Sequence, residues 1–345
     1  MKDKYNVAIV GATGAVGREM MDILDERNFP LGELRLLASE RSAGKEIKFK
    51  GDNLTIQKLD HDSFGGIDIA LFSAGSSRTK EFADSAVSAG AVVIDNSSAY
   101  RLDPKVPLVI PEINPGAIKD HKQKGIIANP NCTTAVTIMA LKPLHDLGKI
   151  KRVIVTSFQA VSGAGAGGLR ELEQQTMAWA NSEESESETF PHPIAFNVIP
   201  QIDVFQDNGY TREEMKLHNE TRKILDDNTI NITATTVRVP VFRAHSVSVN
   251  IETENKITAS EARMAFENFP GVKVMDDPKN AVYPMPLDAA GKDDCIVGRI
   301  REDFTIENGL SFWVVGDQLR KGAALNAVQI AELLIKINGQ NKNSI

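Results

Sequence analysis

Residues 5–17 read YNVAIVGATGAVG, an apolar run followed by three glycines spaced three residues apart. The run at residues 5–10 is rich in apolar and β-branched side chains, which favours a strand. Residues 18–24 continue as a predicted helix, so strand, glycine turn and helix follow in that order. Although the spacing is GxxGxxG rather than GxGxxG, glycines here let the backbone approach a pyrophosphate at the helix start. The stretch therefore predicts a dinucleotide site; a plain tight turn is the alternative.

The next predicted strand, at residues 34–38, bears on the choice of dinucleotide. A free ribose 2′-hydroxyl would favour an acidic residue at its end. This chain instead offers Ser39, Arg41 and Ser42, whose hydroxyls and guanidinium suit a 2′-phosphate, although Glu40 between them complicates the assignment. We predict NADP rather than NAD, and the alternative is an ordinary polar loop.

Strand and helix signals keep alternating through the first third of the chain. A buried strand at residues 68–72 ends in the small residues Ser73, Ala74 and Gly75, and a helix at 79–89 and a strand at 91–94 follow. This order predicts a doubly wound parallel sheet whose loops meet the ligand at the carboxyl ends of the strands. The loop after residue 72 is equally consistent with cofactor contact and with a plain turn.

Residues 129–132 read NPNC and place Cys132, one of only two cysteines, between the apolar residues 125–128 and a predicted helix. A helix start presents unpaired N–H groups and partial positive charge, which favour a thiolate and make the sulfur nucleophilic. The alternative is a small buried apolar side chain, as for most free cysteines. Cys295 has no assigned role, and we expect a buried structural thiol.

Length and composition indicate a two-domain enzyme. The 345 residues exceed the usual size of one core, and a net charge of −7 argues against nonspecific nucleic-acid binding. Two cysteines suggest a reducing compartment, and we expect neither a signal peptide nor a membrane span. The expected location is the cytoplasm. No metal site is predicted.

The second half of the chain has a different pattern. Strands are predicted at residues 152–158, 232–239, 245–251, 294–301 and 310–315, with helices at 169–179 and 210–225 and a polar Ser/Glu loop at 181–189. A second, mixed or antiparallel sheet is the simplest interpretation. We expect a dinucleotide-binding domain at residues 1–130, joined by a final helix within 319–345, and an α+β domain at 131–318.

Five motifs, taken together, resemble the aspartate-semialdehyde dehydrogenases: GATGAVG at 11–17, NPNC at 129–132, SFQAVSGAG at 157–165, HNETRKIL at 218–225 and RVPVFRAHS at 238–246. They cover nearly the whole chain in the family's order. The resemblance implies a Rossmann-like domain, a catalytic and dimerisation domain, and a homodimer. It also implies NADPH-dependent conversion of β-aspartyl phosphate to aspartate semialdehyde, on the route to lysine, methionine, threonine and isoleucine.

Residue by residue, the resemblance implies that Cys132 is the nucleophile, His245 the acid/base group and Gln159 an amide that orients the substrate. It implies that the substrate carboxylate binds Arg238, the ammonium binds Glu220, and the phosphate lies near Arg101 and Lys223, with Asn131 also in the substrate site. The cofactor residues carried over, together with those found above, are Gly11, Thr13, Gly14, Ala15, Val16, Gly17, Ser39, Arg41, Ser42, Ser73, Ala74, Gly75, Ser162, Gly163 and Gln318.

Several structural interpretations compete with these roles. A histidine in an apolar strand is more often a hydrogen-bonded core residue, and Glu220 with Lys223 is equally consistent with an ion pair on a helix surface. Arg238 and His245 are separated by an odd number of residues, so one unbroken strand would point them to opposite faces. If they share a site, the chain must bend near Pro240.

Three other functions remain open. An N-acetylglutamyl-phosphate reductase would use similar chemistry, but its acylated nitrogen carries no charge for Glu220. A glyceraldehyde-phosphate-type dehydrogenase would favour an acidic residue at the position of Ser39. A noncatalytic NADP-binding sensor is disfavoured by the presence of Cys132, Gln159, Arg238 and His245 in one chain.

Overall fold

The computed structural model describes residues 2–340, which fold as two compact units. Unit 1 comprises the described residues up to Asn131 and those from Ala323 onward, and unit 2 comprises Cys132–Gly322. The sequence analysis places the domain boundaries after residues 130 and 318, and the structure places them after residues 131 and 322. Each unit has its own six-stranded sheet, so each is described separately.

Unit 1 contains a parallel sheet in the order β5-β2-β1-β6-β7-β8. The chain leaves the central strand β1 toward one edge and then returns to the other side of it, which confirms the predicted doubly wound α/β class. The strands are β1 (Tyr5–Val10), β2 (Leu31–Ala38), β5 (Gln57–Lys58), β6 (Ile69–Phe72), β7 (Val92–Asp95) and β8 (Ile126–Ala128).

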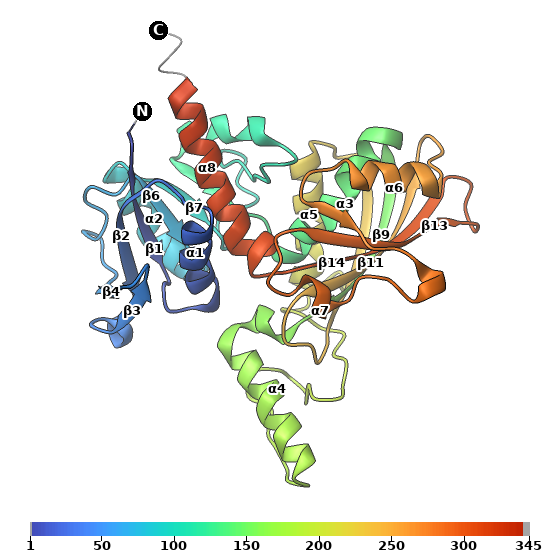
Figure 1. Cartoon of the computed structure of the whole chain (residues 1–345), viewed down its shortest axis with the longest axis horizontal. Coiled ribbons are helices and arrows are strands. Elements are labelled where there is room, and N and C mark those ends of the chain that lie inside the picture. The colour runs from blue at the N-terminus through green and yellow to red at the C-terminus, as the bar shows by residue number, and fades with distance from the viewer. Residues whose placement is uncertain (1, 341–345) are drawn as a thin grey trace. The chain divides into compact units, whose positions relative to one another are not determined.

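Three helices accompany this sheet: α1 (Ala15–Glu26), α2 (Ser76–Ser88) and α8 (Leu325–Gln340) (Figure 1). Although it comes from the end of the chain, α8 packs against α1, and Arg27 pairs with Glu332 at 2.7 Å. Apolar side chains of α1 and α8 join those of the central strands in one core, because each helix turns its apolar face to the sheet. The hairpin β3 (Glu46–Phe49) and β4 (Asp52–Thr55) adds a small separate sheet.

The glycine turn between β1 and α1 depends on two close approaches. Gly11 has a φ of +92°, a conformation that favours glycine. Gly17 packs so tightly that an added Cβ would overlap the Gly11 carbonyl. Gly14 is the N-cap of α1 and provides no side-chain hydrogen bond to it. The first N–H groups of the helix are therefore not capped by that residue, as suits an anion-binding turn.

Unit 2 contains a mixed sheet in the order β10-β9-β11-β14-β13-β12, which confirms the second, mixed sheet of the sequence analysis. The β9/β10 and β12/β13 pairs are parallel, and the pairs between them are antiparallel. The strands are β9 (Ile150–Gln159), β10 (Asn231–Arg238), β11 (His245–Thr253), β12 (Val272–Val274), β13 (Cys295–Asp303) and β14 (Gly309–Gly316).

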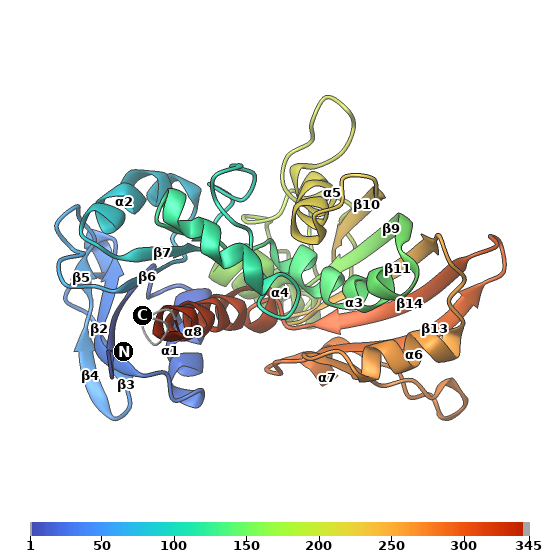
Figure 2. The same cartoon turned by 90° about the horizontal axis from the view of Figure 1, so that it is seen from above.

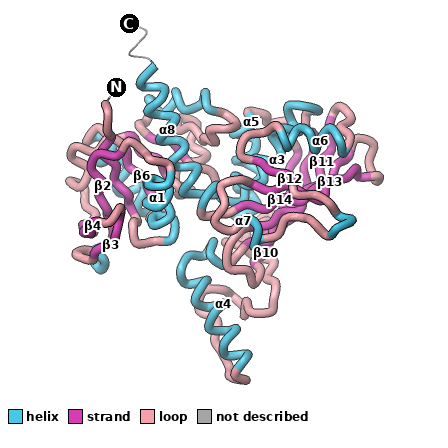
Figure 3. The backbone as a smooth tube through the Cα atoms, viewed as in Figure 1, coloured by secondary structure: helices cyan, strands magenta, loops and turns pink. Residues whose placement is uncertain are grey.

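Helices α3 (Cys132–Gly148), α5 (Arg212–Leu225) and α6 (Ala259–Glu267) pack on the sheet of unit 2 (Figure 2). Helix α4 (Gly165–Ala180) extends away from that sheet with the exposed loop that contains the Ser/Glu tract (Figure 3). The short helix α7 (Pro286–Ala289) precedes β13. Cys295 is fully buried in β13, in agreement with a structural thiol.

Local differences from the sequence prediction occur where elements are short or strained. The expected helix beginning at residue 319 is a π-helical turn at Arg320–Ala324 followed by α8. Glycine at position 322 packs there against Cys132, with an added Cβ only 2.8 Å from the cysteine Cβ. The prediction also missed β3, β4, α6 and β12, whose periodic patterns are brief.

Gly17→Ala should destabilise unit 1 by about 1–3 kcal/mol, because the methyl group must displace the Gly11 carbonyl. The matched control is Gly65→Ala, since an added Cβ there meets no atom within 4 Å, and it should cost less than about 0.5 kcal/mol. Urea unfolding of both variants measures the difference. Equal losses would contradict the close packing assigned to Gly17.

Candidate active site

Cys132 is the first residue of α3, where the chain leaves β8 through Pro130 and Asn131. Its side chain is partly exposed, and its Sγ lies 3.6 Å from Nε2 of His245. The sulfur therefore combines a helix N-terminus with an imidazole neighbour, two features that stabilise a thiolate.

His245 is the first residue of β11 and is fully buried. Its Nδ1 accepts a hydrogen bond from the backbone N–H of Ala160 at 3.2 Å. The proton of the neutral ring therefore belongs on Nε2, the nitrogen that faces Cys132. Burial lowers the pKa of His245 well below its ordinary value, the charge of Arg238 adds to this shift, and the Ala244 carbonyl opposes it.

Arg238 and His245 lie in one site because the chain turns between β10 and β11. Ala244, just before the histidine, has a φ of +74°. An added Cβ on Gly163 would be 2.9 Å from Nη1 of Arg238 and 3.4 Å from Cε1 of His245. Arg238 donates from Nη1 to the Ala160 carbonyl at 2.7 Å, so Ala160 links both side chains through its backbone. The bend expected near Pro240 is present.

Gln159 ends β9 directly beside Arg238 in the register of the two parallel strands. Its Nε2 donates to Ser157 Oγ at 3.2 Å and to Glu213 Oε1 at 3.3 Å. Glu213 was missed by the sequence analysis, although it precedes Glu220 by seven residues, two turns of the same helix. That spacing was the available signal.

Glu220 and Lys223 both lie on α5, as expected. Glu220 is only 1 % exposed, so it does not belong to the solvent face of the helix. Lys223 is partly buried. A carboxylate this deeply buried is costly unless it has a partner, so Glu220 is not an ordinary surface group.

Arg101 and Asn131 belong to unit 1 and are buried there. The Arg101 guanidinium donates from Nε to the Asn129 carbonyl at 2.8 Å and from Nη2 to the Asn96 carbonyl at 2.7 Å. Asn131 directly precedes Cys132 in the chain.

A cavity of about 550 Å³ lies in unit 1 beside the glycine turn. Six predicted cofactor residues line it, namely Gly11, Thr13, Gly14, Ser39, Ser73 and Ala74. The other six in unit 1 do not line it. Ala15, Val16 and Gly17 belong to α1, Gly75 is the N-cap of α2, and Arg41 and Ser42 lie in a 3-10 turn after β2. Sequence reasoning missed Lys58, Arg78 and Phe82 in the lining, because no glycine or strand-end pattern points to them.

The remaining predicted cofactor residues, Ser162, Gly163 and Gln318, lie together in unit 2 beside His245. Gln318 donates from Nε2 to Ser162 Oγ. Its Oε1 accepts from the N–H of Ala244 at 2.8 Å. Gln318 thus supports the strained residue that precedes the histidine.

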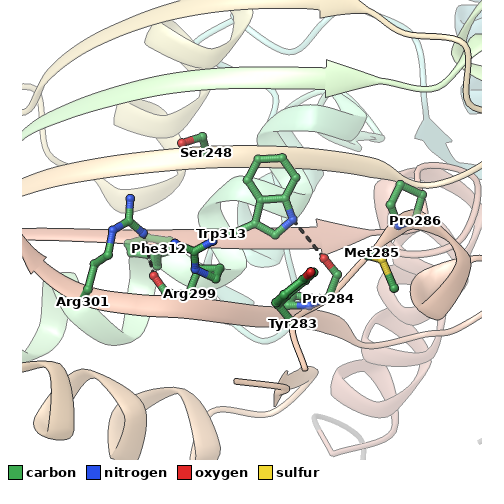
Figure 4. A pocket seen from close by; sticks show the side chains of 9 residues that line it. All are labelled: Ser248, Tyr283, Pro284, Met285, Pro286, Arg299, Arg301, Phe312 and Trp313. Carbon is green, nitrogen blue, oxygen red and sulfur yellow. Dashed lines mark hydrogen bonds between the residues drawn. The ribbon is translucent and has the colours of Figure 1, made fainter. Parts of the chain in front are cut away.

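A separate hollow of about 290 Å³ lies on the sheet of unit 2 (Figure 4). Trp313 of β14 and residues 283–286 form one wall, with the indole Nε1 donating to the Pro284 carbonyl at 3.1 Å. Arg299 and Arg301 of β13 lie on the other side.

Two negative findings concern residues 2–340. No group of three or more His, Cys, Asp and Glu residues is placed to hold a metal ion. None of the helices in this range has the length and apolar character needed to cross a membrane.

The dinucleotide-type fold of unit 1, together with the thiol–imidazole pair of unit 2, is typical of an oxidoreductase that uses a nicotinamide cofactor. The model for the semialdehyde dehydrogenase NAD-binding domain matches residues 6–121, and the model for the semialdehyde dehydrogenase dimerisation domain matches 141–321. The chain belongs to the aspartate-semialdehyde dehydrogenase family. This confirms the resemblance and the enzyme class predicted from sequence.

Three relatives illustrate the match. The aspartate-semialdehyde dehydrogenase of Aquifex aeolicus is 58% identical over 96% of this chain and 98% of its own. A crystal structure of aspartate semialdehyde dehydrogenase II from Vibrio cholerae, complexed with ASA, has a TM-score of 0.94 at 48% identity, covering 96% of this chain and 98% of that one. The Candida albicans structure with NADP has a TM-score of 0.74 at 25% identity, covering 96% and 98%.

Removing the buried imidazole should change how stability depends on pH. In the folded state the depressed pKa keeps His245 neutral, whereas in the unfolded chain it binds a proton below about pH 6.5. This group therefore makes the wild type lose stability as the pH falls, at up to about 1.4 kcal/mol per pH unit. His245→Asn should lack that loss. Urea unfolding at pH 7.5 and pH 5.5 measures it, and parallel losses in the two proteins would contradict a neutral His245.

Proposed function

We propose that this chain reduces β-aspartyl phosphate to aspartate semialdehyde with NADPH and releases phosphate, a step in the synthesis of lysine, methionine, threonine and isoleucine. The observation that carries the proposal is the 3.6 Å approach of Cys132 Sγ to His245 Nε2 at the start of α3, beside Arg238. The family supports the substrate, since the relatives carry the name of this reaction's product.

In the proposed reaction, the Cys132 sulfur attacks the acyl carbon of β-aspartyl phosphate and the C–O bond to phosphate breaks. A thioester on Cys132 results. NADPH, when bound, supplies the hydride that reduces this thioester. Collapse of the resulting tetrahedral species breaks the C–S bond and releases the aldehyde.

We propose that His245 acts through Nε2 as a hydrogen-bond donor to the reacting groups. The hydrogen bond from Ala160 occupies Nδ1, so the ring presents its Nε2 proton to the sulfur and to the oxygen of the tetrahedral species. The ring stays neutral near pH 7 because its pKa is low. The acid/base role that the resemblance implies for His245 stays a prediction.

The charged groups of the substrate indicate which side chains bind them. β-Aspartyl phosphate has a carboxylate, an ammonium and a phosphate, so its site needs cations and one anion. We propose that Arg238 binds the carboxylate and Glu220 the ammonium, while Arg101, Lys223 and Asn131 serve the phosphate side. A buried carboxylate at Glu220 favours this substrate over N-acetylglutamyl phosphate, whose nitrogen carries no charge.

The cavity of unit 1 supports a preference for NADP. The pyrophosphate would meet the N–H groups at the start of α1, where the N-cap residue Gly14 supplies no competing side chain. Ser39 lines the cavity, and with the nearby Arg41 and Ser42 it suits a 2′-phosphate. The cations Lys58 and Arg78 also line it, but Arg78 is paired with Glu81 at 2.7 Å. The acid that complicated the sequence interpretation, Glu40, is paired with Lys58 at 3.2 Å.

We further propose that the protein is a homodimer in the cytoplasm. Neither cysteine is in a disulfide, consistent with a reducing compartment. Helix α3 packs on β9, β11, β13 and β14, and alternate residues of β9 point the other way, with Ile154, Thr156 and Phe158 only partly buried. Phe158 and Trp313 lie 5.5 Å apart between ring centres. Such a face suits a second copy of the chain.

Ile154→Arg should weaken the proposed dimer, because a charge would be buried at the centre of that face. Sedimentation should give the wild type twice the chain mass of 37.6 kDa and shift the variant toward a single chain. Met264→Arg is the control, since Met264 is exposed on α6, and it should remain dimeric. A dimeric Ile154→Arg protein would exclude this interface.

Cys132→Ala should abolish turnover while leaving the cavity of unit 1 intact. The assay is phosphate-dependent reduction of NADP by aspartate semialdehyde, the reverse reaction, repeated with NAD. Activity should fall by at least about 10⁴-fold, as for loss of a covalent nucleophile, with unchanged NADPH binding by fluorescence. A variant that binds NADPH normally and still turns over would exclude the mechanism. An inactive wild type would exclude the proposed substrate.

A further inference from the structure

We propose that Glu213 positions Gln159 and Arg238 for the reaction, although no relative's description assigns it a role. The inference rests on the proposed function of this site. Glu213 is the second residue of α5 and is 5 % exposed. A carboxylate buried to this degree needs partners that stabilise its charge.

The two carboxylate oxygens of Glu213 bind different groups. Oε1 accepts from Nε2 of Gln159 at 3.3 Å, and Oε2 accepts from Nζ of Lys216 at 2.9 Å. Lys216 also donates to Asp203 at 3.0 Å. Burial opposes the charge of Lys216, but Glu213 and Asp203 outweigh burial and raise its pKa. Glu213 therefore faces a charged lysine on one side and the site amide on the other.

An ionised carboxylate only accepts hydrogen bonds, so it decides which end of the Gln159 amide faces it. Nε2 must point to Glu213, and its second N–H reaches Ser157 Oγ at 3.2 Å. Both amide protons are thus engaged, which leaves Oε1 as the atom for a ligand. Gln159 should therefore accept from a donor such as the substrate ammonium, rather than donate to the tetrahedral oxygen.

Glu213 also acts on Arg238. Burial lowers the pKa of the Arg238 guanidinium, and the negative charges of Glu213 and Cys132 oppose that shift. Arg238 in turn donates to the Ala160 carbonyl at 2.7 Å. One carboxylate thus orients the amide at the end of β9 and balances the cation at the end of β10.

A purely structural role is the competing explanation, since acidic residues in the first turn stabilise a helix. The next residue, Glu214, already caps the N-terminus of α5. Its Oε2 accepts from Thr211 N–H at 2.7 Å in a capping box, and its Oε1 accepts from Thr236 N–H at 2.9 Å. Glu214 is 8 % exposed, so it is a matched control at nearly equal burial.

The test compares Glu213→Ala, Glu214→Ala, Gln159→Ala and the double variant Glu213→Ala/Gln159→Ala in the full-length protein. The readouts are kcat and KM for aspartate semialdehyde, NADPH affinity and thermal midpoint. Glu213→Ala should lower kcat/KM at least 10-fold with unchanged NADPH affinity. Glu214→Ala should lower the thermal midpoint but change kcat/KM less than 3-fold. Because Glu213 acts partly through Gln159, the double variant should lose less kcat/KM than the product of the two single losses.

The proposal is overturned if Glu213→Ala keeps kcat/KM within 3-fold of wild type, or if the losses multiply in the double variant. If Glu213→Ala does not fold, Glu213→Gln replaces it, because glutamine keeps the volume but loses the charge that holds Lys216 and Arg238. That variant should lower kcat/KM at least 3-fold, and no change would overturn the proposal. An inactive wild type would refute the proposed function, whereas an active wild type with an indifferent Glu213 refutes only the positioning role.

Discussion

The backbone of Ala160 is the contact on which the candidate active site in unit 2 depends. Its N–H donates to Nδ1 of His245 and its carbonyl accepts from Arg238. The first hydrogen bond places the imidazole proton on Nε2, opposite Cys132, and the second holds a cation beside the ring. A peptide group cannot change its protonation, so this arrangement does not vary with pH as a side-chain partner would.

The topology of the sheet brings these groups to one edge. β9 and β10 run parallel, so Gln159 and Arg238 end them side by side. β11 runs antiparallel to β9 and begins at the same edge with His245, which is paired in register with Gly316 at the end of β14. Three strand ends and one strand start therefore supply the amide, the cation, the imidazole and the segment that contains Gln318. Irregular backbone at this edge, such as Ala244 with its positive φ, is held by side chains rather than by ladder hydrogen bonds.

Sequence reasoning succeeded where a short stretch of the chain contains the residues that determine the local structure. Glycines at positions 11, 14 and 17 predicted the turn before α1, and the NPNC motif predicted a helix that starts at Cys132. It failed where the structure depends on contacts between residues that are far apart in the chain. Glu213 accepts a hydrogen bond from Gln159, which is 54 positions away in the chain. Lys58 lines the cavity of unit 1 but lies in a strand of only two residues. The tautomer of His245 is likewise set by a residue 85 positions away, and no local pattern reveals it.

The proposed reaction passes through a thioester between the Cys132 sulfur and the acyl group of the substrate. The most direct measurement is mass spectrometry of protein mixed with β-aspartyl phosphate in the absence of NADPH and quenched in acid, which preserves thioesters. We expect one aspartyl adduct, on the peptide that contains Cys132, and its loss on adding hydroxylamine. An adduct on Cys295 or on any other residue, or no adduct in a protein that turns over, would contradict it.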